Sequence, residues 1–142
     1  MRSARRRSRE LALQGLYAWQ VSGGSAADLQ AQLAESSAFG KADARYFAYL
    51  LAGTIAHAAE LEQLLAPALD RKPAELSPVE RAILLLAVFE LRDAPDVPYR
   101  VVINEAVELA KAFGGTDGHK YVNGVLDKLA ATLRAEERRQ KA

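Results

Sequence analysis

The segment SPVERAILLLAVFELR, residues 77–92, decides the fold. Its start has the pattern of a capping box, in which the Ser77 hydroxyl accepts from a free backbone amide, Pro78 takes the first helical position, and Glu80 reaches back. The apolar residues that follow cover almost the whole circumference of a helix. We therefore expect this helix to lie at the centre of the molecule and to contact both halves of the chain.

Helical periodicity extends from this segment in both directions, and no alternating run is long enough to compete as a strand. Before it, we predict a first helix from about Ala4 or Ser8 to Gln20 and helices over about 25–35 and 43–65, the third being one long helix. After it, we predict helices over about 98–113 and from Thr116 or Asp117 to about 133, with a frayed tail. The predicted fold class is all-α.

The chain has 142 residues, a length that favours one domain over 1–142 with a real hydrophobic core. The segment DRKPAEL, residues 70–76, is the plausible seam between helical halves of about 1–69 and 76–142. Each half is too short for us to expect an independent domain.

Composition excludes several classes of function. The chain has no cysteine and only two histidines, which argues against disulfides, a metal centre and a cysteine nucleophile. We therefore expect no enzyme activity, no cofactor and no metal. Neither a secretory signal nor an apolar run of ~20 residues is present, so a soluble cytoplasmic protein is expected and no membrane partner.

Positive charge gathers at the N-terminus. The first ten residues, MRSARRRSRE, hold five arginines against one glutamate, whereas the rest of the chain holds fourteen basic and seventeen acidic residues. Clustered guanidinium groups suit a phosphate backbone, but such a run can also be a solvated arm. Arg2, Arg5, Arg6 and Arg9 share one helical stripe that continues into apolar positions, so we expect the first turns to overhang the bundle or to fray.

A second polar surface is predicted on the last helix, where Asp117, Tyr121, Gly124 and Lys128 share one face. An exposed tyrosine beside Lys120 and Lys128 can stack an unpaired base while the cations hold the backbone. The alternative is an aromatic side chain at the edge of the core with its hydroxyl in water.

Four stretches together resemble the NusB family of bacterial transcription antitermination factors. They are RRRSRELALQGLYAWQ at 5–20, YFAYLLAG at 46–53, SPVERAILLLAVFEL at 77–91 and DVPYRVVINEAVELAKAFGGTDGHKYVNGVLDKL at 96–129. The likeness spans nearly the whole chain in the expected order. Tyr121 stands where the family usually has phenylalanine, a change that preserves stacking.

The resemblance implies two packed three-helix-type halves and a binding activity. It implies a partner, the small-subunit ribosomal protein NusE, with which the protein would hold the boxA element of nascent single-stranded RNA. RNA polymerase in the antitermination complex would then read through terminators, notably in ribosomal RNA operons. The family's RNA surface maps onto Arg5, Arg6, Arg7, Arg9, Asp117, Lys120 and Tyr121, and its NusE surface onto Glu75 and Glu80.

Two rival functions follow from the same residues. NusB-like domains also occur fused to RNA cytosine methyltransferases, but this sequence lacks a parallel-sheet domain, a glycine-rich cofactor loop and a cysteine nucleophile. A dimerising bundle with an inert arginine arm is the other rival, and a homodimer remains open.

Overall fold

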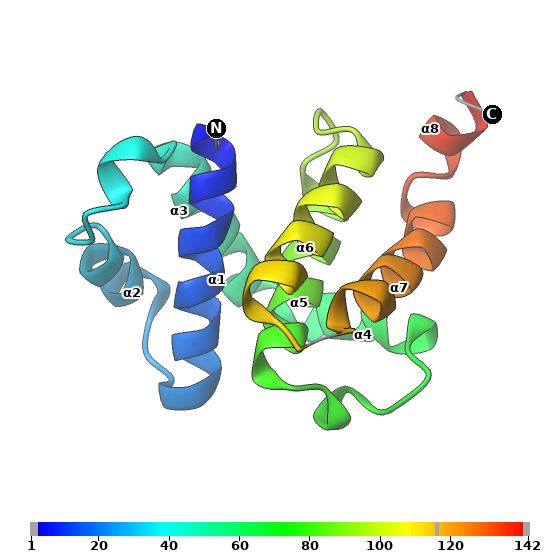
Figure 1. Ribbon diagram of the computed structural model, residues 1–142, viewed down its shortest axis with the longest axis horizontal. Helices are drawn as coiled ribbons and strands as arrows, with labels where there is room; N and C mark the ends of the chain where they lie inside the picture. The colour runs from blue at the N-terminus through cyan, green and yellow to red at the C-terminus, as the bar shows by residue number, and fades with distance from the viewer. Residues whose placement is uncertain (1–2, 116, 141–142) are drawn as a thin grey trace. The chain divides into compact units, whose positions relative to one another are not determined.

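The computed structural model describes residues 3–115 and 117–140, in which helices and connecting turns occur and no β-strand (Figure 1). The predicted all-α class is confirmed. The chain divides into two compact units, Met1–Ala58 and Ala59–Ala142, so the division falls before the expected seam at 70–76. That the two units act as one domain stays a prediction. Within the described residues, no helix is both long and apolar enough to cross a membrane.

The first unit is built on α1, which lies beside α3 (Figure 1). At Gly15 the α1 backbone lies so close to its neighbours that an added Cβ would be 2.8 Å from Leu51 Cδ1 of α3 and 3.1 Å from Leu33 Cδ1 of α2. The unit comprises α1 (Ala4–Ser22), α2 (Ala26–Leu33), the short 3-10 helix η1 (Phe39–Lys41) and α3 (Ala44–Ala56).

Local signals set the helix boundaries in this unit. The side chains of Ser3, Ser25 and Asp43 each accept a hydrogen bond from a backbone amide three residues ahead, as good N-caps do. At the other end of α1, Gly23 and Gly24 adopt φ values of 76° and 103°, which favour glycine. The predicted helices at 4–20 and 25–35 are confirmed.

The predicted single helix over 43–65 is wrong. The structure has two helices instead: α3 ends at Ala56, and α4 (Ala58–Leu65) begins two residues later. His57 between them has φ −110° and ψ 16°, outside the helical region. Gly53 and the β-branched residues that follow it have low helix propensity, which weakens the helix before His57. The periodic apolar pattern continues across this point, although the helical backbone ends there.

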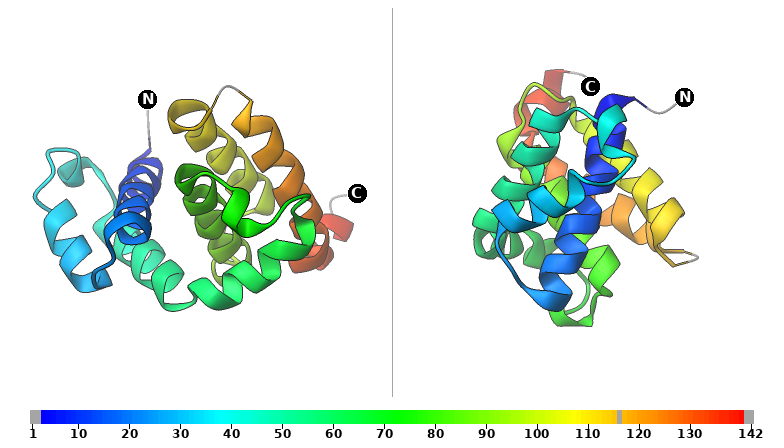
Figure 2. Two further views of the ribbon diagram at one scale, coloured as in Figure 1. Left: turned by 90° about the horizontal axis from the view of Figure 1, so that it is seen from below. Right: turned by 90° about the vertical axis from the view of Figure 1, so that its left-hand side faces the viewer.

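The second unit is organised around α5 (Pro78–Asp93), whose residues from Ala82 to Leu91 are all buried. The capping box is confirmed, because Glu80 N–H donates to Ser77 Oγ (3.1 Å) and Ser77 N–H donates to Glu80 Oε1 (3.3 Å). Contact of α5 with both halves of the chain stays a prediction. Figure 2 shows α6 and α7 beside α5. The remaining elements are η2 (Ala66–Ala68), η3 (Pro73–Glu75), α6 (Tyr99–Phe113), α7 (Gly118–Leu133) and α8 (Ala135–Gln140).

Two arginines of α5 form ion pairs with glutamates of α4. Arg81 forms a two-pronged ion pair with Glu62, with N–O distances of 3.0 and 3.1 Å. Arg92 donates to Glu60 Oε2 at 2.9 Å. Paired, planar contacts of this kind fix the direction of a helix better than a single lysine contact does, so α4 leads the chain to the 66–77 segment in a defined position.

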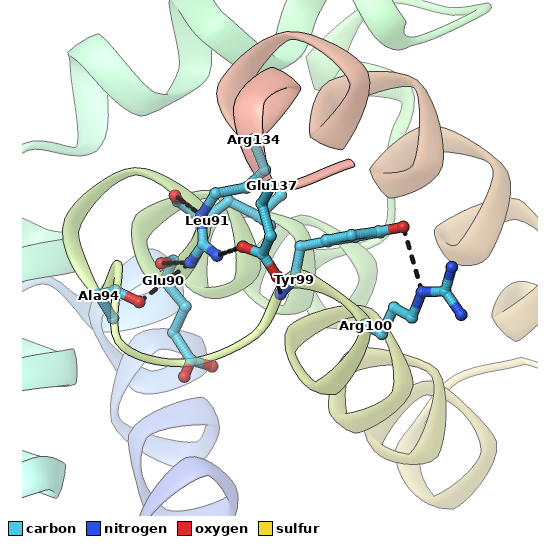
Figure 3. A network of polar contacts seen from close by, with 7 residues as sticks. All are labelled: Glu90, Leu91, Ala94, Tyr99, Arg100, Arg134 and Glu137. Atoms are coloured by element: carbon cyan, nitrogen blue, oxygen red, sulfur yellow. Dashed lines mark hydrogen bonds and ion pairs between the residues drawn. The ribbon is translucent and has the colours of Figure 1, made fainter. Parts of the chain in front are cut away.

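The expectation of a frayed C-terminal tail is also wrong for the described residues, because α8 is anchored by Arg134 (Figure 3). This side chain is only 7% exposed. Its guanidinium donates to the carbonyls of Leu91 (2.7 Å), Glu90 (3.3 Å) and Ala94 (3.0 Å). These carbonyls lie at the C-terminal end of α5 and its cap. Those of Glu90 and Ala94 also accept backbone N–H groups, whereas the i+4 residue of Leu91 is Pro95, which has no N–H to donate.

Glu137 completes this arrangement. One of its carboxylate oxygens accepts from Arg134 Nη1 at 2.5 Å, and the other accepts from the Tyr99 backbone N–H at 3.0 Å. The ends of α5 and α7 and the start of α6 are therefore joined through one buried arginine and one glutamate, which we call the Arg134 clasp. The charge-rich sequence RAEERRQKA gave no indication of it.

We predict that Arg134→Met lowers the free energy of unfolding by roughly 2–4 kcal/mol, because it removes the side-chain donor to the Leu91 carbonyl and the cation that pairs with Glu137. Urea unfolding monitored by circular dichroism measures this change. Arg139→Met is the matched control, since Arg139 pairs with Glu136 on the exposed side of α8 and should contribute less than about 0.5 kcal/mol. Equal effects of the two substitutions would contradict a special role for Arg134.

Candidate nucleic-acid interface

The arginine run forms the first two turns of α1. Arg5 is exposed, while Arg6 and Arg7 are half-buried, and no acidic residue stands in the first turn. Positive side chains at a helix N-terminus oppose the helix dipole, whose positive end lies there. This turn therefore combines the positive end of a helix dipole with guanidinium groups, both of which attract an anion. Arg2 lies outside the described residues.

The start of α1 is nevertheless well anchored within its unit. Ser8 Oγ donates to the backbone carbonyl of Asp43 at 2.7 Å, and the Asp43 N–H donates to the carbonyl of Ala4 at 3.3 Å. The first turn is thus attached to the beginning of α3. The expectation that these turns overhang the bundle or fray is wrong, because hydrogen bonds and ring contacts compensate for the clustered charge.

Tyr46 of α3 provides the ring contacts. Its side chain is 7% exposed, and the guanidinium carbons of Arg5 and Arg9 lie 4.1 Å and 5.5 Å from its ring centre. Each such cation–π contact contributes about 0.5–2 kcal/mol, depending on its exposure. Arg9 itself is only 4% exposed. Of the mapped arginines, Arg5, Arg6 and Arg7 therefore form the accessible surface, whereas Arg9 lies beneath it.

The second mapped surface lies at the start of α7. Asp117 precedes the helix, is well exposed and makes no capping hydrogen bond with its side chain. Lys120, one turn later, lies 3.6 Å from the Asp117 carboxylate, and both side chains are more than 70% exposed. An ion pair so open to solvent is weak, so both groups remain available to a ligand. Thr116, the alternative start of the helix, lies outside the described residues.

The expectation of an exposed Tyr121 is wrong. The ring is half-buried, and its hydroxyl is fully buried without a hydrogen bond to any described residue. Arg71, from the segment before α5, lies over the ring with its guanidinium carbon 4.2 Å from the ring centre. One face of Tyr121 is therefore occupied by a cation from another part of the same unit.

Asp70 and Arg71 form a charged pair beside this ring. Arg71 Nε donates to Asp70 Oδ1 at 2.8 Å, and this hydrogen bond is the main reason why the pKa of Asp70 is lowered. The pKa of the Tyr121 hydroxyl is raised, chiefly by burial and also by the neighbouring Asp70 carboxylate. Asp70 is thus near the hydroxyl, although the two groups do not form a hydrogen bond of good geometry.

Glu80, mapped as a partner residue, lies close to the start of α7. A Cβ added to Gly118 would be 3.4 Å from Glu80 Oε2. Glu80 also contributes to the raised pKa of Arg71, after the larger effect of Asp70. The second unit thus brings Glu80, Arg71 and the first turn of α7 together, while Glu75 stands exposed at the end of η3.

The mapped residues therefore form two surfaces, one on each unit: the arginine turn of α1, and the α7 start with Asp117, Lys120 and Tyr121. That both surfaces bind one RNA molecule stays a prediction. Sequence analysis missed Arg71, because DRKPAEL has no periodic pattern and a contact with Tyr121 depends on the folded path. In the described residues, no three His, Cys, Asp or Glu side chains gather as a metal site would require.

These features define a class of protein: a helical bundle that presents cationic surfaces suited to nucleic acid. Comparison with known proteins agrees. The model of the NusB family matches residues 6–131. The chain is 60% identical to the transcription antitermination protein NusB of Nitrosomonas europaea, over 96% of this chain and 81% of that protein. It is 59% identical to that of Paraburkholderia phytofirmans, over 96% and 95%.

Solved structures give the same result. The fold matches T. maritima NusB with a TM-score of 0.83, 29% identity, and coverage of 98% of this chain and 99% of that one. A chain in the crystal structure of antitermination factors NusB and NusE with double-stranded RNA matches with a TM-score of 0.80, 27% identity, and coverage of 87% and 93%. The chain belongs to the NusB family. It is accordingly a transcription antitermination factor and not an enzyme.

We predict that Tyr121→Phe raises the free energy of unfolding by about 1 kcal/mol, because it removes a buried hydroxyl without a partner and keeps the ring beneath Arg71. Chemical unfolding of both proteins measures the difference. Tyr17→Phe, at an exposed position of α1, should leave stability unchanged. A loss of stability in Tyr121→Phe would instead reveal a hydrogen bond between its hydroxyl and Asp70.

Proposed function

We propose that this protein holds boxA-type single-stranded RNA together with NusE and so promotes read-through by RNA polymerase, notably in ribosomal RNA operons. Its place of action is then the cytoplasm, on the nascent transcript. The observation that carries the proposal is the first turn of α1, which concentrates guanidinium groups at the positive end of a helix and contains no carboxylate. A bound phosphate would relieve that electrostatic conflict.

In this proposal the arginine turn supplies affinity. Arg5, Arg6 and Arg7 contact phosphates, which any RNA sequence presents equally. Arg9 acts indirectly: from its buried position it supports Tyr46, the ring on which the Arg5 guanidinium rests. This contact limits the freedom of Arg5 before RNA binds, and a pre-organised arginine loses less entropy on binding.

The start of α7 supplies discrimination. Asp117 can accept hydrogen bonds from base amino groups, and Lys120 can bind the adjoining phosphate. Tyr121 can stack a base only on the face opposite Arg71, because the guanidinium occupies the other. The stacked base would therefore enter from one defined side. Asp117 also repels phosphates, which weakens binding to RNA that offers no matching base.

NusE is proposed to bind around Glu75 and Glu80. Glu75 lies in η3, just before α5, and Glu80 lies in the first turn of α5, close to the α7 start. A partner seated there would stand beside the RNA and could add contacts of its own, which raises affinity without more charge on this chain. The structure of NusB and NusE with RNA is a precedent for such an assembly in a similar protein.

The RNA proposal is tested with Arg5→Gln/Arg7→Gln, titrated with a boxA-type RNA at two salt concentrations. We expect weaker binding, and a slope of log affinity against log salt that is shallower by about 1.4, because two single-strand phosphate contacts are lost. Helicity should be unchanged. An inert arginine arm, as in a purely dimerising bundle, would give equal affinities, and size-exclusion chromatography would then show no shift on adding RNA.

The partner proposal is tested with two substitutions in one capping box. Glu80→Gln keeps an acceptor for the Ser77 amide but removes the charge, whereas Ser77→Ala keeps the charge but removes the cap, at about 1 kcal/mol. We expect calorimetry to show that Glu80→Gln weakens NusE binding and that Ser77→Ala leaves it nearly unchanged. The reverse pattern would assign Glu80 to helix capping alone.

A further inference from the structure

A groove of about 600 Å³, with polar and apolar lining, runs between α6 and α7 of the second unit. It is separate from the ring of Tyr121 but shares Lys120 with the α7 surface described above. Four basic side chains line it against one acidic side chain. These are Arg100, Lys111, Lys120 and Arg138, with Asp127 as the acid. The lining therefore favours an anionic ligand.

Not all of these cations are equally available. Arg138 donates to the carbonyl and carboxylate of Asp127, at 2.9 and 3.1 Å, so these two charges offset each other. Lys111 lies 3.9 Å from Glu108, and both are well exposed, so this pair is weak. The Lys120 pair with Asp117 is similarly open. The groove thus keeps three cations for a ligand: Arg100, Lys111 and Lys120.

Arg100 is connected through Tyr99 to Glu137 of the Arg134 clasp. Its Nε donates to Tyr99 Oη at 3.1 Å, and Tyr99 is buried with its backbone N–H bonded to Glu137. Figure 3 shows the rest of the guanidinium pointing away from this network. A guanidinium fixed at one nitrogen and open at the others is well suited to a phosphate.

The groove also offers neutral hydrogen-bonding groups. Asn104 of α6 and Asn123 of α7 line it from opposite sides, and both are exposed. An amide side chain both donates and accepts, as the edge of a nucleobase does, whereas an acidic peptide needs only donors. Lys120 joins the groove to the proposed RNA surface at the α7 start. These two observations favour RNA over an acidic protein as the occupant.

We propose that RNA held at the α7 start continues along the α6–α7 groove, with phosphates on Lys111 and Arg100 and bases beside Asn104 and Asn123. The inference rests on the proposed function. Lys111 and Arg100 are eleven residues apart on one helix, hence about 16 Å along it. At the 3.4 Å spacing of a stacked strand, this distance corresponds to about five nucleotides. The groove would thus read sequence that flanks the core element.

The test compares a core boxA-type RNA with the same RNA extended by about five nucleotides at its 5′ end or its 3′ end. Wild-type protein should bind one extended RNA more tightly than the core, roughly tenfold at low salt. Arg100→Gln/Lys111→Gln should abolish this gain, make the salt slope for that RNA shallower by about 1.4, and leave binding of the core RNA unchanged. Both residues are exposed, so the melting temperature should not change.

Lys41→Gln/Arg139→Gln removes the same charge at exposed positions outside the groove lining and is the matched control. It should affect core and extended RNA equally. The proposed RNA path is overturned if neither extension strengthens binding. It is also overturned if Arg100→Gln/Lys111→Gln still binds the extended RNA more tightly than the core RNA. Failure of wild-type protein to bind the core RNA would overturn the proposed function as well. Weaker binding of poly-glutamate by the groove variant, with RNA binding intact, would instead assign the groove to an acidic protein.

Discussion

The second unit depends on how the C-terminal carbonyls of a buried helix are satisfied. Because α5 is buried along most of its length, its last carbonyls cannot all reach water, and unmet acceptors there would be costly. Arg134 donates to the carbonyls of Leu91, Glu90 and the capping residue Ala94, and Glu137 pairs with Arg134 while also accepting from the first amide of α6. The ends of α5, α6 and α7 are thereby fixed together, and so is the groove that α6 and α7 enclose.

In the first unit, by contrast, the clustered positive charge at the start of α1 is an electrostatic cost that a bound anion would reduce. Arginines in the first turn of α1 oppose the helix dipole and one another. The Ser3 cap, the Ser8 hydrogen bonds and the Tyr46 ring keep the turn helical despite this. The protein thus maintains a rigid cationic surface instead of a solvated arm, and a rigid surface loses less conformational entropy when it binds an anion.

Sequence predicted what is encoded locally and missed what depends on distant contacts. The capping box, the glycine stops and the apolar periodicity identified the helices, because each acts within one or two turns. The break at His57 was missed because the apolar pattern continues across it. Arg134 in a charge-rich tail resembles any solvated arginine, and Arg71 in a linker resembles a surface residue. Their roles arise from carbonyls 40 or more residues away and from the Tyr121 ring.

If RNA and NusE bind as proposed, the position of Glu80 would couple them through electrostatics. Its carboxylate lies next to Gly118 at the positive end of α7, where it stabilises the helix but also lowers the local attraction for phosphate. A cationic group of NusE that pairs with Glu80 would cancel this repulsion close to Asp117 and Lys120. RNA should then bind more tightly to the pair than to this protein alone, and by thermodynamic reciprocity RNA would strengthen NusE binding equally. Such coupling needs no change of shape, because the charges already lie within a few ångströms of the helix start.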